Sequence, residues 1–207
     1  MSQSHQFHPS ILRAYDIRGV ADETLFPADA EFIGKTFCSS VIRATGKKNP
    51  NIALAYDGRL STPSLRDAFI RGALSTGATI WNFGIGPSPM LYFSVHHHNA
   101  DAGVMITGSH NPGTHNGFKM MLGKASFYGD SITQMGTMAQ KGDFEKGDGK
   151  EVAMDSKDAY LDTLAAAFKP EGAKTLKVVI DPGNGSAGAI SQALAARLPG
   201  DVKVING

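Results

Sequence analysis

A chain of 207 residues is long enough for one large domain, or for one domain and part of another. Its 42% hydrophobic and 19% charged residues are typical of a globular protein, and 20 basic against 19 acidic residues leave a formal net charge of +1. That balance gives no reason to expect a nucleic-acid partner or a membrane surface, and no apolar run reaches the roughly 18 residues that span a bilayer.

The single cysteine, Cys38, excludes an internal disulfide. The first residues have neither the basic region nor the apolar region of a signal peptide. We therefore expect a cytoplasmic protein in a reducing compartment.

Short apolar runs alternate with helical patterns up to about residue 140, which indicates an α/β domain. Ser61 and Pro63 are typical of a helix start, the serine as a capping hydroxyl and the proline in the first turn. Helices are expected over about 27–44, from 62 to near 77, and through a stretch that includes 91 and 95. Strands are expected over 51–56, 78–83, 102–106 and 117–122.

The character of the sequence changes over 141–150, which is charged and glycine-rich and is expected to be a solvated turn or linker. A helix is then expected near Tyr160, Leu164 and Phe168. Beyond it, a strand over 176–180, a glycine loop over 183–188, a helix over 190–198 and a strand over 202–205 are expected.

These patterns divide the chain into a first domain over 1–154, and a linker helix with the truncated start of a second, similar α/β domain over 155–207. One strand–helix–strand unit leaves sheet edges and apolar faces open. We therefore expect the second domain to be incomplete here, which also allows self-association through it.

The segment from Gly103 to Lys119 contains the residues best suited to chemistry. A strand leads into the loop Thr107-Gly-Ser-His-Asn-Pro112, where glycine permits a positive φ and the Ser109 hydroxyl can stand out from the turn. Three hydrogen-bond donors that are suited to binding a phosphate lie close to Ser109 in the sequence: His110, Asn111 and Lys119. Taken alone, this composition favours an ordinary turn over a catalytic loop.

This loop resembles the phosphoserine loop of the α-D-phosphohexomutases, and Asn116-Gly-Phe-Lys119 follows at the spacing of that family. The segment Arg13-Ala-Tyr-Asp-Ile-Arg-Gly19 resembles the opening signature of the bacterial phosphomannomutase/phosphoglucomutase branch. The other segments in family order are Asp57-Gly-Arg59, Gly86-Pro-Ser-Pro89 and Val179-Ile-Asp-Pro-Gly-Asn-Gly185.

The resemblance implies a mixed, mainly parallel sheet covered by helices, and an isomerase that interconverts hexose 1-phosphates and hexose 6-phosphates through a hexose 1,6-bisphosphate. It implies that Ser109 carries the phosphoryl group, with His110 and Asn111 orienting it. Arg18 and Lys119 would be the acid/base pair, or the cations that assist the attacking hydroxyl, and Tyr15 would lie beside the sugar.

The family also binds Mg²⁺ through the serine phosphate and three aspartates of an Asp-x-Asp-x-Asp loop, which this sequence does not contain. Ser109 would be the metal ligand supplied here, so we expect the chain alone to be inactive as a mutase. Two alternatives stay open. One is a phosphoglucosamine mutase, although that branch more usually begins with a Gly-Thr-Asp-Gly type of sequence, and the other is a non-catalytic binding or assembly module.

Two further patterns have simpler interpretations. Gly183 to Gly188 fits the G-x-G-x-x-G dinucleotide pattern, but the acidic residue expected about 20 positions later is absent, which favours a structural turn. His96, His97 and His98 could suggest a metal site. Consecutive residues of a helix point in different directions, so a polar helix end is the better interpretation.

Overall fold

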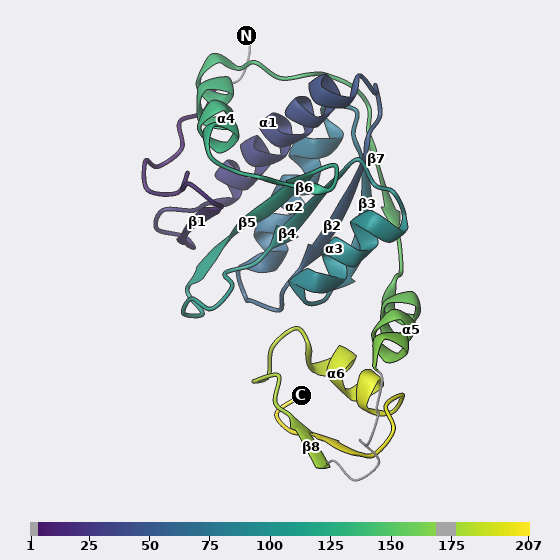
Figure 1. The fold of residues 1–207 in the computed structure, drawn as a ribbon. Helices are drawn as coiled ribbons and strands as arrows, with labels where there is room; N and C mark the ends of the chain where they lie inside the picture. The colour runs from purple at the N-terminus through teal and green to yellow at the C-terminus, as the bar shows by residue number, and fades with distance from the viewer. Residues whose placement is uncertain (1–3, 169–176) are drawn as a thin grey trace.

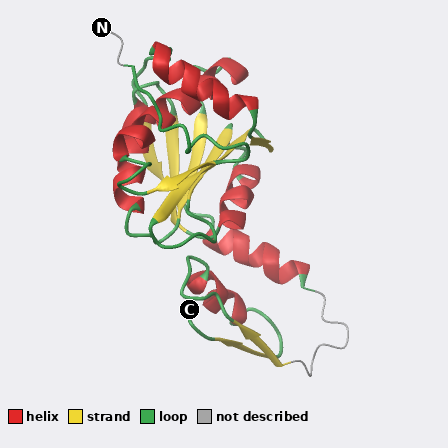
Figure 2. Ribbon diagram, turned by 90° about the vertical axis from the view of Figure 1, so that its left-hand side faces the viewer, coloured by secondary structure: helices red, strands yellow, loops and turns green. Residues whose placement is uncertain are grey.

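The computed structural model describes residues 4–168 and 177–207, and its larger unit is a sheet between two layers of helices (Figures 1 and 2). In chain order its elements are β1 (Ile17–Val20), α1 (Pro27–Thr45), β2 (Asn51–Tyr56), α2 (Thr62–Leu74), β3 (Thr79–Ile85), α3 (Ser88–His97), β4 (Ala102–Ile106), β5 (His115–Leu122), β6 (Ala125–Phe127), α4 (Asp130–Lys141) and β7 (Lys150–Ala153).

The strand order is β1-β5-β4-β2-β3-β7, and β6 pairs with β5. Strands β4, β2, β3 and β7 pair in parallel, whereas β5 is antiparallel to β1, β4 and β6. Within this sheet β5 therefore runs against all the others. The expected mixed, mainly parallel sheet covered by helices is confirmed.

The central strands β2 and β4 are buried on both faces, as continuous apolar runs predict for parallel strands. Ile52 and Leu54 face the core under α1, α2 and α4, whereas Ala53 and Ala55 face the smaller core under α3. A side chain at Gly103 would collide with Val95, so α3 lies directly on the backbone of β4.

Helices α1 and α2 cross at two glycines. A Cβ at Gly34 would collide with the carbonyl oxygen of Phe69, and a Cβ at Gly72 would collide with the carbonyl oxygen of Glu31. Both glycines are buried, and each meets the backbone of the other helix. The close approach of the two helices therefore depends on the absence of side chains at these positions.

Residues 141–150 are exposed or half-buried, as expected of a solvated turn or linker, but their backbone is bonded to the rest of the domain. The Gly147 N–H donates to the Ser75 carbonyl at 3.0 Å, and the Gly149 N–H donates to the Leu74 carbonyl at 2.9 Å. A Cβ at Gly149 would collide with the Ala78 carbonyl, so the glycines here allow a close approach to the end of α2. The charged side chains remain outside, and the segment leads directly into β7 on the edge of the sheet.

The predicted capping role of the Ser61 hydroxyl is also wrong. Ser61 makes no side-chain cap bond to α2. Its Oγ instead accepts from Nδ2 of Asn116 at 2.9 Å, because this buried amide of β5 reaches the start of the helix.

The structure also contains four elements that were not expected from the sequence: β1, β6, α4 and β7.

A second, smaller unit follows the helix α5 (Lys157–Ala167) and consists of β8 (Lys177–Ile180), α6 (Gly188–Ala195) and β9 (Asp201–Val204). The strands β8 and β9 are parallel, which confirms the strand–helix–strand unit. Leu176, the first residue of the expected strand, lies outside the described residues. Val179 is 62% exposed, so a face of this small sheet is open to solvent.

Helix α5 joins the two units (Figure 1). Met90, Leu161 and Ile190 form a small apolar cluster between α3, α5 and α6. At the start of α5 the buried Ser156 hydroxyl lies 2.9 Å from Nε2 of His98, whose pKa is held below its ordinary value by burial and by the neighbouring His97. No helix within residues 4–168 and 177–207 is both long and apolar enough to cross a membrane.

The helix crossing yields the first prediction. Gly72→Ala should lower the free energy of unfolding by about 1–3 kcal/mol, the usual range for overpacking a close contact. Gly113→Ala is the control, because a Cβ at Gly113 meets open space. It should leave stability unchanged or slightly increased, since alanine restricts the unfolded chain. Urea unfolding of both variants measures the difference, and equal midpoints would contradict the close crossing.

Candidate active site

The loop that contains Ser109 connects β4 to β5 at the end of the central strands. Ser109 has a φ of 55°, a left-handed conformation that costs a residue other than glycine roughly 1–2 kcal/mol. Its N–H donates to Oγ1 of Thr107 at 2.9 Å, and its Oγ lies 3.2 Å from Nδ1 of His110. The loop therefore presents a partly exposed hydroxyl beside an imidazole.

The Asp57 carboxylate, at the end of the neighbouring strand β2, holds the first half of this loop. The side chain of Asp57 is 12% exposed and accepts five hydrogen bonds. The donors are the Arg59 N–H and Nε, the Thr62 hydroxyl, the Thr107 hydroxyl and the Gly108 N–H. One carboxylate thus joins the ends of β2 and β4 to the start of α2.

The Arg59 guanidinium holds the second half. It lies across the loop and donates to the carbonyl oxygens of three loop residues and of His115, the first residue of β5. The distances are 2.9 Å to Ser109, 2.8 Å to Asn111, 2.6 Å to Pro112 and 3.0 Å to His115. The loop has no regular secondary structure, so these bonds replace those that a strand or helix would provide.

Two cations share a buried carboxylate beside the loop. Lys119 is on β5, and its Nζ lies 2.9 Å from Oδ2 of Asp16. Arg18 on β1 pairs with the same oxygen. The register that pairs Ile17 with Phe118 places Asp16 opposite Lys119, and Asp16 is 6% exposed. The strand pairing therefore fixes all three charges together.

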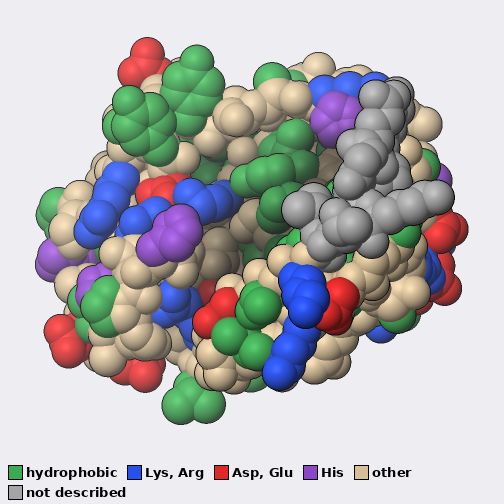
Figure 3. Space-filling model, turned by 60° about the horizontal axis from the view of Figure 1, so that its bottom comes forward, with side chains coloured by type: hydrophobic (Ala, Val, Ile, Leu, Met, Phe, Trp, Pro, Cys, Tyr) green, Lys and Arg blue, Asp and Glu red, His purple; other side chains and the backbone are tan. Residues whose placement is uncertain are grey.

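Ser109, His110 and Lys119 line one pocket of about 410 Å³. Its wall includes Pro87 and Ser88 from the segment 86–89, and Ser186 from the glycine loop after β8. Figure 3 shows this hollowed end of the molecule, with Lys, Arg and His side chains gathered beside the hollow. Both units therefore contribute to the surroundings of Ser109.

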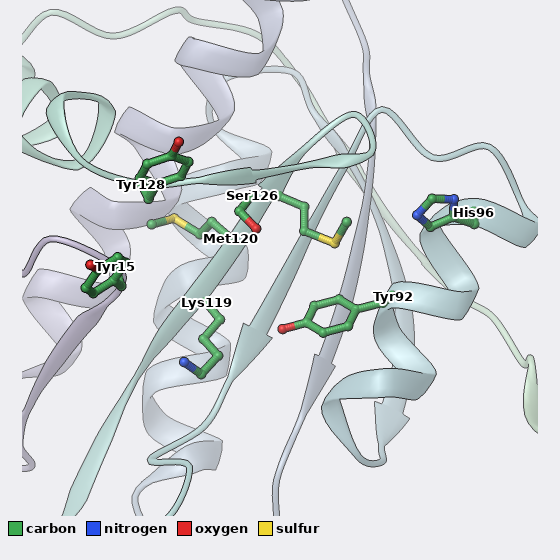
Figure 4. Close-up of a pocket in the computed structure, with 8 residues that line it drawn as sticks. Tyr15, Tyr92, His96, Lys119, Met120, Ser126 and Tyr128 are labelled. Atoms are coloured by element: carbon green, nitrogen blue, oxygen red, sulfur yellow. The ribbon is translucent and has the colours of Figure 1, made fainter.

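A second hollow of about 650 Å³ adjoins this pocket, and Lys119 and Tyr92 line both. Tyr92 extends from α3 toward the strand that carries Lys119, while Tyr15 and Tyr128 lie on the opposite side (Figure 4). Tyr15 is 82% exposed, so its ring is free to contact a ligand.

The structure thus brings together three of the residues singled out in the sequence, Ser109, His110 and Lys119, around one pocket. Arg18 reaches them through the shared carboxylate, and Tyr15 lies in the adjoining hollow. The Asn111 amide is used within the loop, where its Nδ2 donates to the Gly108 carbonyl at 2.9 Å.

Asp16, Asp57 and Arg59 received no role in the sequence analysis. A signal for Asp16 was present, because Asp16 and Arg18 are two residues apart and so share a face of an extended strand. Four of the five bonds of Arg59 go to backbone carbonyls, which leave no mark in the sequence.

The side chains of this site do not by themselves fit a magnesium ion, which prefers several oxygen ligands in octahedral geometry. Within residues 4–168 and 177–207, no three His, Cys, Asp or Glu side chains are grouped to hold a metal ion. The two carboxylates near the loop, Asp16 and Asp57, already accept hydrogen bonds from cations. The three histidines at the end of α3 have different surroundings: His98 bonds to Ser156, His97 stacks on Phe93 and meets the edge of the His98 ring, and His96 lines the larger hollow.

The shared carboxylate yields the second prediction. Asp16→Asn should lower the free energy of unfolding by about 1–3 kcal/mol, because it leaves two partly buried cations side by side without their anion. The matched control is Asp143→Asn, which removes one of the two exposed carboxylate partners of Arg43 and should barely change the urea midpoint. If both variants unfold at the same urea concentration, the cluster does not depend on Asp16.

Comparison with known proteins places this geometry in a family. A model of the phosphoglucomutase/phosphomannomutase alpha/beta/alpha domain I matches residues 9–144. A phosphoglucomutase of Neisseria gonorrhoeae is 38% identical over 194 residues, which are 93% of this chain and 41% of that protein. A phosphomannomutase/phosphoglucomutase of Pseudomonas aeruginosa PAO1 is 35% identical over 189 residues, which are 91% of this chain and 40% of that protein.

The fold agrees with these matches. The crystal structure of a phosphoglucomutase/phosphomannomutase family protein from Burkholderia thailandensis superposes with a TM-score of 0.88 at 35% identity, over 97% of this chain and 44% of that one. The chain spans about 40% of the length of the curated relatives named above. Because the domain I model matches most of its length, the chain belongs to the phosphoglucomutase/phosphomannomutase family.

Proposed function

We propose that this chain supplies the phosphoserine-bearing part of a hexose phosphate mutase, with Ser109 as the residue that carries the phosphoryl group. The observation that carries the proposal is the position of the Ser109 hydroxyl, which lies in a held, left-handed turn and faces a pocket shared with His110 and Lys119. Phosphoryl transfer depends mainly on positioning and charge stabilisation, and this site offers both.

In the proposed reaction the Ser109 phosphate passes to a free hydroxyl of a hexose phosphate. A new P–O bond forms to the sugar oxygen, which loses its proton, and the bond between phosphorus and Ser109 Oγ breaks. Ser109 Oγ regains a proton, and the sugar becomes a hexose 1,6-bisphosphate. Return of its other phosphate to Ser109 completes the interconversion of the 1-phosphate and the 6-phosphate.

The surrounding residues take roles that their positions support. Lys119 and Arg18 offer positive charge beside the transferred group, and either can exchange the proton of the attacking hydroxyl. His110 contacts the Ser109 hydroxyl directly and orients it, and Asn111 helps to hold the same turn. Tyr15, exposed at the rim of the adjoining hollow, contacts the sugar.

The proposal also concerns the ligands of Mg²⁺. Its described side chains offer no carboxylate set for Mg²⁺ beside Ser109. The metal would contact the serine phosphate and neutralise charge there, and its protein ligands would come from sequence that this chain does not contain. The 207-residue chain alone should therefore show no mutase turnover.

A chimera tests the proposal. This chain replaces the matching N-terminal part of the Neisseria gonorrhoeae phosphoglucomutase, and a coupled assay follows the conversion of glucose 1-phosphate. The chimera should turn over and Ser109→Ala should abolish turnover. Arg18→Ala and Lys119→Ala should each lower kcat about 10²–10³-fold, because they act on charge that develops during transfer.

The N. gonorrhoeae enzyme is the positive control, and circular dichroism confirms that each chimera is folded. A folded chimera without activity would refute the proposal that this chain supplies the phosphoserine. Activity that survives Ser109→Ala would refute the assignment of the serine. Variants of Arg18 and Lys119 that keep kcat and only raise KM would identify these residues as binding groups.

A further inference from the structure

Arg59 lies against the loop of the proposed phosphoserine, and an arginine in such a place is commonly a phosphate ligand. A guanidinium has five N–H donors. In Arg59, Nε donates to Asp57, two donors on Nη1 go to Pro112 and His115, and two on Nη2 go to Ser109 and Asn111. All five donors are used inside the protein.

The same guanidinium is fixed from a further side by the backbone of Gly108. A Cβ at Gly108 would collide with Cζ and Nε of Arg59 and with the carbonyl oxygen of His115. The side chain of Arg59 is 14% exposed and borders a hollow of about 460 Å³ that Ser109 also lines, but its five N–H donors all point to partners within the protein. The glycine before the serine therefore makes room for the arginine.

One of the bonds from Arg59 goes to Ser109, whose backbone has a positive φ. Ser109 is held in its left-handed conformation from both sides, by Thr107 on its N–H and by Arg59 on its carbonyl oxygen. Loss of the guanidinium would free four neighbouring carbonyls at once. The turn could then relax to ordinary φ values and carry the Ser109 hydroxyl away from the pocket.

We infer that Arg59 is a positioning residue that sets the orientation of Ser109 and takes no part in binding phosphate. The expected effect of Arg59 on the rate of transfer rests on the proposed function. Its effect on the conformation of the loop does not. A displacement of about 1 Å in a reacting group can cost about 10² in rate. Loss of Arg59 should therefore lower the rate of transfer without weakening the binding of the sugar phosphate.

Two independent variants displace the guanidinium. Arg59→Lys keeps the positive charge but cannot reach five acceptors, and Gly108→Ala keeps the arginine but pushes it aside. The matched controls are Arg66→Lys, on α2 with its guanidinium on Asp67 and Tyr56, and Gly113→Ala, in the same loop with open space around it.

The first measurement uses the 207-residue chain and needs no activity. Amide hydrogen exchange by NMR should become at least about tenfold faster at Ser109, Asn111 and His115 in both test variants and remain as in the unmodified chain in both controls. Strands β2 and β4 serve as the internal reference. Unchanged exchange in Arg59→Lys and Gly108→Ala would overturn the inference, whatever the chimera does.

The second measurement uses the chimera. Both test variants should lose about 10²-fold in kcat with KM within twofold of the unsubstituted chimera, and the controls should keep both values. An Arg59→Lys variant that keeps kcat and raises KM would show that Arg59 binds phosphate, which overturns the inference but leaves the proposed function standing. An inactive unsubstituted chimera would refute the proposed function, and the exchange measurement then decides the inference by itself.

Discussion

The site depends first on one ion pair, between Asp57 and Arg59. The loop between β4 and β5 has no helix or strand to satisfy its backbone, and a single guanidinium binds three of its carbonyl oxygens and that of His115 at the start of β5. The carboxylate partner takes the Thr107 hydroxyl and the Gly108 N–H from the other end of the loop. The side chains of this pair are themselves largely buried, and their bonds to the backbone on both sides of Ser109 hold the left-handed serine at the end of a buried strand.

The second constraint is the reversed direction of β5. Every other strand of the main sheet runs the opposite way, and this reversal lets the chain leave β4, form the serine loop and return alongside it. Lys119 then pairs in register with Met105, the next-to-last residue of β4, and lies opposite Asp16, the residue just before β1. Ser109 and the cationic pair meet because one short loop and one strand reversal place them there. The aromatic hollow beside Lys119 extends this surface along the same strand.

The parts of this structure that the sequence predicted are those with strong local patterns. Strands β2 and β4 were expected at their observed bounds because strands buried on both faces consist of continuous apolar runs. The edge strand β7 reads Lys-Glu-Val-Ala and carries no such pattern, so its pairing with β3 came only from the structure. Asp16 and Lys119 are 103 residues apart, and no local pattern reveals a strand register over that distance. The resemblance identified Ser109, whereas the atoms that hold it were invisible, because they are mostly backbone oxygens.

The central claim is that this framework presents one particular hydroxyl for phosphorylation. Two other serines, Ser88 and Ser186, line the same pocket as Ser109, so phosphorylation of either of them is the alternative outcome. The most direct test incubates the chimera with glucose 1,6-bisphosphate and locates the added phosphate by peptide mass spectrometry. The account predicts one phosphate, on the peptide that contains Ser109 and on that serine. Phosphate on Ser88 or Ser186, or none in a folded and active chimera, would contradict it.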